Sequence, residues 1–244
     1  MNQHTYEKLI ALKVEKMAAV YRDMDEMPDA DSLTFDQKME LMVDAECDYQ
    51  ENKKLERRIR NARFADRDAS IESIKYFKDR QLDRKQILSL ATNQYIYQPK
   101  NVFLIGATGS GKTYLSCALG NSACQNNYRV RYIRMAEYFA EFNIARQIGN
   151  VTKVIKRLSS YDLLIIDDWL LYPTVNKDLE SILEVIEKRY KNKATIICSQ
   201  YEVDGWHKKL GGGAIADAIL DRLTAKSETI LIKGNSSMRS RSEE

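Results

Sequence analysis

Apolar residues recur at helical intervals over the first hundred residues, and no stretch there alternates with period two. This part of the chain is therefore predicted to be helical. A first helix is expected over 4–26, because Pro28 and the acidic turn around it end the pattern. A second is expected to begin near Thr34 and to continue to Phe64, since Thr34 and Gln37 have the spacing of a capping box. Shorter helices are expected at Ser70–Phe77 and Asp83–Asn93.

From Pro99 onward, short apolar runs alternate with helical segments. Strands are expected at 102–105, 129–133, 162–167, 195–199 and 229–232, and helices near 112–126, 135–146, 151–159, 176–191 and 214–224. Strands that are apolar throughout and separated by helices indicate a parallel sheet covered on both faces. The sequence thus predicts an α/β domain after an all-helical region. The polar tail Gly234–Glu244 is expected to fray.

Composition narrows the class of protein. Hydrophobic residues make up 44% and charged residues 30% of the 244-residue chain, as in ordinary globular proteins. The apolar runs are far shorter than the ~18 residues of a membrane-spanning helix, and the N-terminus lacks the apolar core of a signal peptide. We therefore expect a cytoplasmic protein with no membrane partner. The four cysteines have no C-x-x-C spacing, so neither a zinc site nor disulfides are expected.

Charge is distributed unevenly along the chain. Residues 1–50 hold 5 Lys and Arg against 12 Asp and Glu, whereas residues 51–100 hold 13 against 7. The basic part contains a dense run that is a candidate contact for DNA phosphates, with a solvated helix face as the alternative. The candidate DNA-binding residues are Lys53, Lys54, Arg57, Arg58, Arg60 and Arg63.

The clearest motif lies between the first predicted strand and the helix after it, and it matches G-x-x-x-x-G-K-[ST] in full. Its glycines let successive backbone N–H groups face phosphate oxygens at the positive end of a helix. Lys112 supplies a charge to the β- and γ-phosphates, and Thr113 a hydroxyl to Mg²⁺. The motif predicts ATP and Mg²⁺ as cofactors. The predicted phosphate loop consists of Gly106, Ala107, Thr108, Gly109, Ser110, Gly111, Lys112 and Thr113.

Two further predicted strands end in polar residues. The apolar run at 163–166 leads into Asp167 and Asp168, and ligands of parallel sheets bind at the carboxyl ends of strands. Asp167 is predicted to hold Mg²⁺, and Asp168 to orient or deprotonate the water that attacks the γ-phosphate. If the strand at 195–199 lies between the first and third strands, Ser199 or Gln200 would face the same phosphate.

Two arginines are candidates for stabilising charge on the transferred phosphate, because the guanidinium is planar and stays protonated. Arg222 lies in the predicted helix before the last strand, and Arg239 lies in the tail. Either could instead be a solvated surface cation.

Several segments together resemble the IstB-like ATP-binding proteins of bacterial insertion sequences. They are GATGSGKT, LLIIDDW, IICSQ, the W-H-x-x-L around Trp206, and ADAILDRL. These proteins are transposition helpers of the AAA+ superfamily, close to the helicase loader DnaC and the initiator DnaA. The resemblance covers nearly the whole chain, including the basic segment ENKKLERRIRNARF. Many ATPases share the ATP motifs, whereas DDW, AILDRL and the basic segment are more specific.

The resemblance implies a role for each matching position and the strand order 5-1-4-3-2. Arg222 would be an arginine finger that reaches the ATP of a neighbouring subunit, and Arg239 would be a second sensing arginine. The other implied roles are magnesium carboxylate for Asp167, catalytic acid for Asp168, and first sensor for Ser199 and Gln200.

The chain departs from the family pattern in three places. Leu170 stands where a glycine is common, and the segment before Arg239 is one residue longer than usual, which leaves the placement of Arg239 open. Only twelve residues follow Ile232, too few for a helical lid, so the ATP site is expected to be open and completed by a neighbour. The expected domains are a helical DNA and assembly domain at 1–68, a helical linker at 69–98 and the ATPase domain at 99–244.

The expected function is that of an ATP-dependent, DNA-binding transposition helper. ATP binding would drive self-assembly of a homo-oligomer on double-stranded DNA, and the assembly would recruit and stimulate a partner transposase. ATP would be hydrolysed to ADP and phosphate. The alternatives are a DnaC-like loader of a replicative helicase, a small-molecule P-loop kinase, and a DNA-bridging protein that binds ATP but barely hydrolyses it.

Overall fold

The structure, a computed structural model, describes residues 2–27, 30–234, 237–238 and 240–243. Its contacts divide the chain into two compact units, Met1–Arg57 and Arg58–Glu244. The sequence predicts boundaries after residues 68 and 98, whereas the unit that holds the sheet already begins at Arg58. No helix among the described residues has both the length and the apolar character needed to cross a membrane.

The first unit is helical, as predicted. Its elements are α1 (Gln3–Ala11), α2 (Glu15–Asp23), the 3-10 helices η1 (Met24–Glu26) and η2 (Ala30–Ser32), and most of α3 (Phe35–Ala62). The prediction of one helix over 4–26 is wrong, because Lys13 has a left-handed backbone (φ +63°) between α1 and α2. The capping box is confirmed. The Thr34 N–H donates to Gln37 Oε1 (2.8 Å), and the Gln37 N–H donates to Thr34 Oγ1 (3.3 Å).

A carboxylate of α3 caps the N-terminus of α2. Glu46, which is buried, accepts hydrogen bonds from the backbone N–H groups of Lys16 (2.8 Å) and Met17 (3.3 Å), and from Gln50 Nε2 (2.7 Å). Burial by itself would raise the pKa of Glu46, but these hydrogen bonds outweigh it and lower the pKa. A negative group at a helix N-terminus also interacts favourably with the helix dipole.

We expect Glu46→Gln to destabilise the N-terminal helices by about 1 kcal/mol at neutral pH, the usual effect of losing a helix cap. Because the folded-state pKa is lowered, the contribution of Glu46 is fully present above its unfolded-state pKa and is lost as the pH falls through the folded-state pKa. Thermal unfolding of the full chain, followed by helical circular dichroism from pH 3 to 7, measures this. The wild type and the variant should converge at the acidic end; a constant difference would contradict the assignment.

The second unit holds a five-stranded sheet and its covering helices. Its helices are the end of α3, η3 (Lys78–Arg80), α4 (Arg84–Ala91), α5 (Gln94–Tyr97), α6 (Lys112–Gln125), α7 (Met135–Gln147), α8 (Val151–Ser160), α9 (Asn176–Arg189), η4 (Val203–Gly205), α10 (Trp206–Lys209), α11 (Gly213–Thr224) and η5 (Ser240–Glu243). Its strands are β1 (Asn101–Gly106), β2 (Val130–Arg134), β3 (Leu163–Trp169), β4 (Ala194–Ser199) and β5 (Ser227–Ile232). All strand pairs are parallel, in the order β2-β3-β4-β1-β5, which confirms the expected order.

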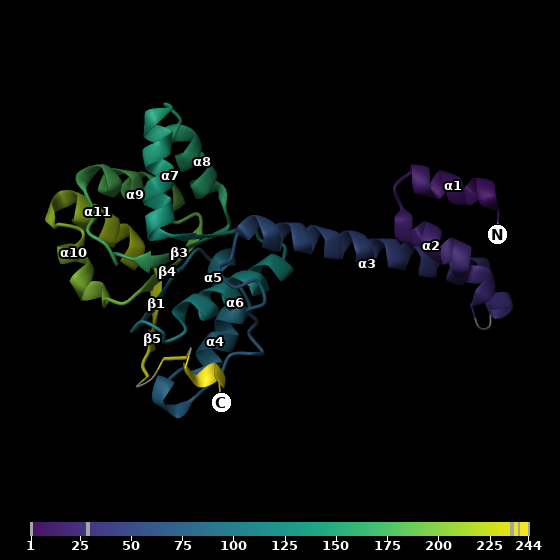
Figure 1. The fold of residues 1–244 in the computed structure, drawn as a ribbon, viewed down its shortest axis with the longest axis horizontal. Helices are drawn as coiled ribbons and strands as arrows, with labels where there is room; N and C mark the ends of the chain where they lie inside the picture. The colour runs from purple at the N-terminus through teal and green to yellow at the C-terminus, as the bar shows by residue number, and fades with distance from the viewer. Residues whose placement is uncertain (1, 28–29, 235–236, 239, 244) are drawn as a thin grey trace. The chain divides into compact units, whose positions relative to one another are not determined.

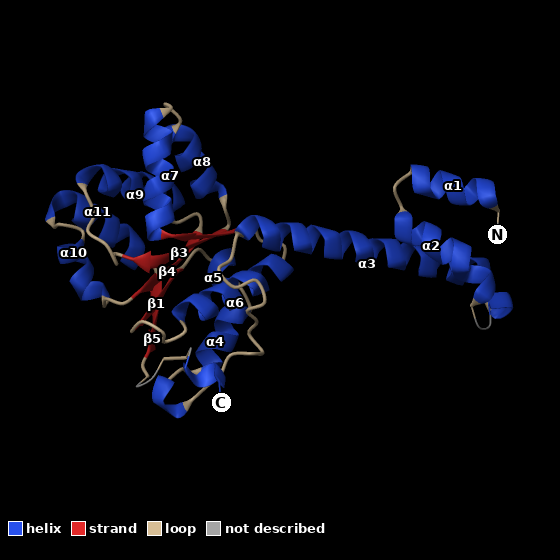
Figure 2. Ribbon diagram, in the orientation of Figure 1, coloured by secondary structure: helices blue, strands red, loops and turns tan. Residues whose placement is uncertain are grey.

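The central strands β1, β3 and β4 are buried on both sides because helices cover both faces of the sheet (Figures 1 and 2), whereas the edge strand β5 is partly exposed. Helices α7 to α11 lie on one face, where Phe103 and Ile105 of β1 join a continuous hydrophobic cluster with side chains of these helices. Helix α6 lies on the other face, with α4 beside it. The carboxyl ends of β1, β3 and β4 are thereby fixed next to one another.

Residues before β1 pack on α6 as part of this unit. Phe64 is buried, and a side chain at Gly120 would meet its ring at 2.4 Å, so α6 needs a glycine there. Asn121 Nδ2 of α6 donates to the carbonyls of Arg67 (3.0 Å) and Ala69 (2.7 Å). The helix predicted at Ser70–Phe77 is absent. Its backbone is bound by other partners instead: the Ser70 N–H donates to the Tyr114 hydroxyl of α6 (3.3 Å), and the Lys75 carbonyl accepts from Arg80. The helix predicted at Asp83–Asn93 is confirmed as α4, with Asp83 as its cap.

Described residues of the C-terminal segment contact the rest of the unit, so the predicted fraying is wrong for these residues; positions 235, 236, 239 and 244 lie outside the described residues. The Lys233 N–H donates to the Arg80 carbonyl (3.1 Å), and the Met238 N–H donates to the Gly109 carbonyl (2.8 Å). Arg241 binds both carboxylate oxygens of Asp79, at 3.0 and 2.5 Å. The described part of this segment therefore lies against the phosphate loop.

Candidate functional site

The predicted phosphate loop joins β1 to α6 at the carboxyl end of the sheet. Gly109 and Gly111 have φ of +78° and +92°, the left-handed region in which glycine is favoured. Lys112 is buried, and its Nζ donates to the carbonyls of Gly106 (2.7 Å) and Ala107 (2.9 Å). Burial lowers the pKa of Lys112. The loop thus places an ammonium group and a helix N-terminus in one wall of a cavity.

Asp167 lies at the end of β3, directly beside Thr113. It is 2% exposed, and its Oδ2 accepts hydrogen bonds from Thr113 Oγ1 (2.6 Å) and from the Tyr132 hydroxyl (2.8 Å). Its Oδ1 accepts from the backbone N–H of Asp168 (2.8 Å). These donors fix the carboxylate next to the threonine hydroxyl. Hydroxyl and carboxylate oxygens are the hard ligands that Mg²⁺ prefers, so the pair suits this ion.

Tyr132 is a residue of the site that no sequence motif indicates. It is buried on β2, and burial together with the carboxylate of Asp167 raises its pKa, so it remains a neutral hydrogen-bond donor. Only the order of the strands, which places β2 beside β3, brings this hydroxyl to the site.

Asp168 follows in an irregular part of β3. The β3–β4 register shifts between Ile166 and Trp169, and Asp168 has a left-handed backbone (φ +56°). Its side chain lines the cavity. Burial, followed by the nearby charge of Asp167, raises the pKa of Asp168. A carboxylate with a raised pKa at the edge of a phosphate site is suited to act as a general base.

Leu170 has the backbone conformation that a glycine would adopt most easily, with φ +57°. A left-handed conformation costs a residue with a Cβ atom about 1–2 kcal/mol. The Leu170 side chain is 1% exposed and belongs to the hydrophobic cluster. The burial of its side chain therefore offsets the strain where the family pattern usually has glycine.

The two candidate sensor residues, Ser199 and Gln200, have different environments. Ser199 is 1% exposed, its hydroxyl donates to the Trp169 carbonyl (3.1 Å) and accepts from the Tyr201 N–H (3.1 Å), and it thus fixes the ends of β3 and β4. Gln200 lines the cavity. The sequence does not decide between these two residues, whereas in the structure only Gln200 of the two lines the cavity.

Two buried tryptophans support this edge of the sheet. The Trp169 and Trp206 rings lie 5.7 Å apart, and Trp206 Nε1 donates to the Tyr201 carbonyl (2.9 Å). Their exposed fractions are 1% and 0%, so both are packing residues near the site.

The cavity has a volume of about 780 Å³, and one of its walls comes from residues outside the sequence motifs. The predicted part consists of Thr108, Gly109, Gly111, Lys112, Thr113, Asp167, Asp168 and Gln200. The unexpected lining residues include Asp66, Ser73, Lys75, Arg80, Tyr114 and Met238. The sequence pattern of 65–80 does not indicate that this segment lies at the site; it reaches the site through its packing on α6.

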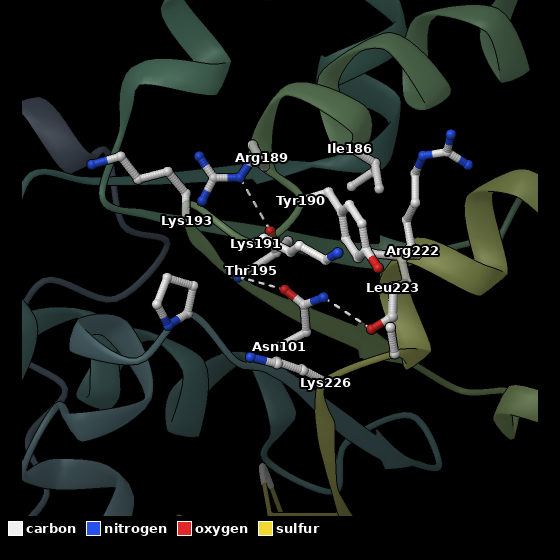
Figure 3. A pocket seen from close by; sticks show the side chains of 12 residues that line it. Asn101, Ile186, Arg189, Tyr190, Lys191, Lys193, Thr195, Arg222, Leu223 and Lys226 are labelled. Carbon is white, nitrogen blue, oxygen red and sulfur yellow. Dashed lines mark hydrogen bonds between the residues drawn. The ribbon is translucent and has the colours of Figure 1, made fainter.

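Arg222 lies near the opposite end of the sheet from the phosphate loop. It lines a separate cavity of about 140 Å³ together with Asn101 and Thr195, which lie at the beginnings of β1 and β4 (Figure 3). In Figure 3 the guanidinium points away from the other side chains of this cavity. Its Nη1 donates to the Ala218 carbonyl (2.8 Å), and its Nη2 pairs with Glu187 (3.3 Å). A six-residue strand spans roughly 20 Å, so this arginine does not reach its own phosphate loop.

The other cations of this small cavity are accounted for by the fold. Arg189 is 1% exposed and donates to Thr195 Oγ1 and to the carbonyls of Leu158, Tyr161 and Ala194. Burial lowers its pKa to about 9. Helices α9 and α11 both end at the cavity, and helix C-termini attract cations. Arg189 thus holds the end of α8 and the start of β4, and Lys193 pairs with Asp162 (2.6 Å), so both have structural roles.

The basic run is mostly exposed. Five of its six residues are exposed, namely Lys53, Lys54, Arg57, Arg60 and Arg63, whereas Arg58 is half-buried. Arg58 Nε donates to the Cys124 carbonyl (2.9 Å), so this arginine holds the end of α3 on α6. Arg239 lies outside the described residues. Among the described residues, no cluster of three or more His, Cys, Asp or Glu side chains could hold a metal ion.

The chain matches the family described as IstB-like ATP binding protein over residues 7–244. It is 34% identical over 237 residues to an insertion sequence ATP-binding protein of Sinorhizobium fredii, covering 97% of this chain and 95% of the relative. It is also 34% identical over 200 residues to the insertion sequence IS1162 ATP-binding protein of Pseudomonas fluorescens, covering 82% and 87%.

Solved structures share the fold of this chain. AMPPCP-bound DnaA from Aquifex aeolicus superposes with a TM-score of 0.60 at 20% identity, over 72% of this chain and about half (53%) of the DnaA chain. The DnaC helicase loader superposes with a TM-score of 0.57 at 19% identity, over 68% of this chain and 97% of the loader. These likenesses establish a P-loop fold of the AAA+ type with a five-stranded parallel sheet. With the match over residues 7–244, the chain belongs to the IstB-like ATP-binding protein family of insertion sequences.

Proposed function

We propose that this protein is an ATPase that assembles on double-stranded DNA and delivers it to the transposase of its insertion sequence. The observation that supports this most directly is the phosphate loop with Thr113 and Asp167 in hydrogen-bond contact, in a chain of the IstB-like family.

ATP binding is assigned to the residues of the large cavity. The backbone of 106–113 and Lys112 bind the phosphates, and Thr113 with Asp167 holds Mg²⁺, which supplies positive charge to phosphate oxygens when bound. Asp168 accepts a proton from the attacking water. Gln200 orients that water or the γ-phosphate, because it lines the cavity and Ser199 does not. The role of Arg239 as a second sensor remains a prediction from the family resemblance.

Hydrolysis is proposed to need a second subunit. Arg222 lies near the opposite end of the sheet from the phosphate loop of its own chain, so an arginine finger at this position acts on the ATP of a neighbour. Self-assembly then switches on hydrolysis.

Sedimentation of the wild type with and without ATP and duplex DNA tests the assembly. Large assemblies should form only with both ligands, and Lys112→Ala should stay small because it lacks the cation that binds the β- and γ-phosphates. Addition of the purified transposase should then increase strand transfer into the DNA that carries the assembly. Assembly that is independent of ATP would contradict the proposal. Strand transfer that does not increase in the presence of the assembly would contradict it as well.

The DNA contact is assigned to the exposed part of the basic run. Reversing Lys53, Lys54 and Arg57 to Glu should weaken DNA binding for all sequences, because phosphate contacts are independent of sequence. The slope of log K against log salt should fall by ~0.9 for every phosphate that the variant no longer neutralises. Fluorescence anisotropy with duplex DNA at several salt concentrations measures both.

A matched variant separates this contact from net charge. Reversing the exposed Lys153, Lys177 and Lys208 changes the net charge equally, and these residues lie outside the run. If both triple variants show the same decrease in affinity and slope, the basic run has no special role in DNA binding.

A further inference from the structure

Arg80 lies directly against the phosphate loop, although α4, α5 and β1 separate the two in the sequence. It ends η3 and is 5% exposed. Its Nη2 donates to the Ser110 carbonyl (3.0 Å), and its Nη1 donates to the Lys75 carbonyl. A side chain at Gly111 would meet Arg80 Nη2 at 2.8 Å, so the guanidinium packs on the backbone of the loop. Arg80 therefore adds its charge to those of Lys112 and Lys75, which also line this cavity.

The protein does not supply hydrogen-bond acceptors for all the donors of the Arg80 guanidinium. It has five N–H donors, and its buried Nε has no acceptor among the described residues. The adjacent carboxylate, Asp79, is bound by Arg241 at 3.0 and 2.5 Å. Arg80 forms no salt bridge with a carboxylate in the described part of the chain. The nearby charge of Asp79 offsets the burial of Arg80 only in part, because burial still lowers the pKa of Arg80. A buried charge is costly, so an anion in this cavity would stabilise the guanidinium.

The turn that carries Arg80 is held in place by the C-terminal segment. The Arg80 carbonyl accepts the Lys233 N–H (3.1 Å), and Arg241 lies over the Phe77 ring at 4.8 Å while it binds Asp79. Contacts on both sides of Arg80 thus fix its backbone. A fixed guanidinium loses little conformational entropy when it binds an anion.

We propose that Arg80 is a nucleotide-binding residue whose guanidinium contacts the phosphate chain of the ATP bound in its own subunit. This inference rests on the proposed binding of ATP to the large cavity. It assigns to the segment before β1 a direct part in phosphate recognition, in addition to the phosphate loop. Hydrogen bonds from a planar guanidinium to phosphate are charge-assisted and strong.

The test is the ATP affinity of the full-length variants Arg80→Met and Arg80→Lys, measured by titration calorimetry at several salt concentrations with Mg²⁺. Arg80→Met should weaken ATP binding about tenfold to hundredfold, the effect of losing a hydrogen bond from a charged group. It should also reduce the dependence of affinity on salt, because one cation no longer meets the phosphates. Arg80→Lys should keep that salt dependence. Arg84→Met, which removes an exposed arginine of α4 that does not line the cavity, should bind ATP like the wild type.

A purely structural role for Arg80 predicts a different result. Arg80→Met would then lower the melting temperature of the nucleotide-free protein, and the salt dependence of ATP binding would equal that of the wild type. That outcome, or unchanged affinity, would overturn the inference. If Lys112→Ala abolishes binding while Arg80→Met does not weaken it, only the role of Arg80 fails. If the wild type does not bind ATP, the proposed function fails as well.

Discussion

Replacing Asp168 with Asn is expected to slow ATP hydrolysis at least a hundredfold and to leave ATP affinity nearly unchanged. Asparagine keeps the shape of the side chain but cannot accept a proton, and general base catalysis is worth about 10²–10⁴ in rate. The backbone should not change, because Asp168 has φ +56° and asparagine tolerates this region as well as aspartate does. Phosphate release under saturating ATP measures the rate, and titration calorimetry measures the affinity.

The pH dependence of hydrolysis provides a second readout for Asp168. Burial and Asp167 raise its pKa, and a general base must be deprotonated to act. Wild-type hydrolysis should therefore decline as the pH falls through this raised pKa, whereas the residual activity of Asp168→Asn should lack that decline. Asp204→Asn, at an exposed carboxylate of η4, is the control and should match the wild type. Equal turnover in Asp168→Asn and the wild type would remove Asp168 from the mechanism.

The sheet and the phosphate loop can be predicted because local sequence determines them. Each strand of a parallel sheet with two covered faces is a short apolar run, and this property identifies the runs ending at Gly106 and Asp167. The phosphate loop has a fixed spacing of glycines and a lysine, since its conformation depends on its own backbone. The paired carboxylates follow from the same rule, because the carboxyl ends of neighbouring strands meet at one edge.

The remaining wall of the cavity cannot be predicted in this way, because distant contacts determine its conformation. Residues 65–80 follow a path set by Asn121 of α6 and by the close approach of Phe64 to Gly120. No periodicity indicates such a path, and helix propensity predicts the wrong structure for Ser70–Phe77. The prediction of fraying is wrong for the described residues of the C-terminal segment for the same reason. Its polar sequence is typical of a frayed tail, but in the structure Asp79 binds Arg241 and the Gly109 carbonyl accepts from the Met238 N–H.

Leu170 shows a different limit of prediction from the sequence. The family pattern identifies the position as unusual, but only the backbone shows why: φ is +57°, and the side chain occupies the hydrophobic cluster. The strain comes from the backbone of Leu170, and the burial that offsets it comes from the side chain. The residue type alone indicates neither.

Replacing Arg222 with Ala should reduce ATP hydrolysis by the assembled protein about 10³- to 10⁵-fold, the range in which arginine fingers accelerate P-loop hydrolases. ATP affinity should stay near that of the wild type, because Arg222 lines a different cavity from the phosphate loop. Folding should change little, since the guanidinium is held by one hydrogen bond to the Ala218 carbonyl and by a partly exposed ion pair with Glu187. Lys226→Ala, at another cation of the same cavity, should hydrolyse ATP like the wild type.

Mixing Arg222→Ala with Lys112→Ala separates a finger in trans from a role within one subunit. The first variant keeps an intact phosphate loop, and the second keeps an intact finger. A mixed assembly therefore contains some interfaces at which an intact finger faces an intact loop, and activity should recover to a fraction of the wild-type rate that depends on the mixing ratio. If sedimentation shows that the two variants co-assemble and hydrolysis still does not recover, Arg222 does not act across the interface. A wild-type rate in Arg222→Ala alone would exclude any role in hydrolysis, because the far end of the sheet would then be irrelevant to the chemistry at the phosphate loop.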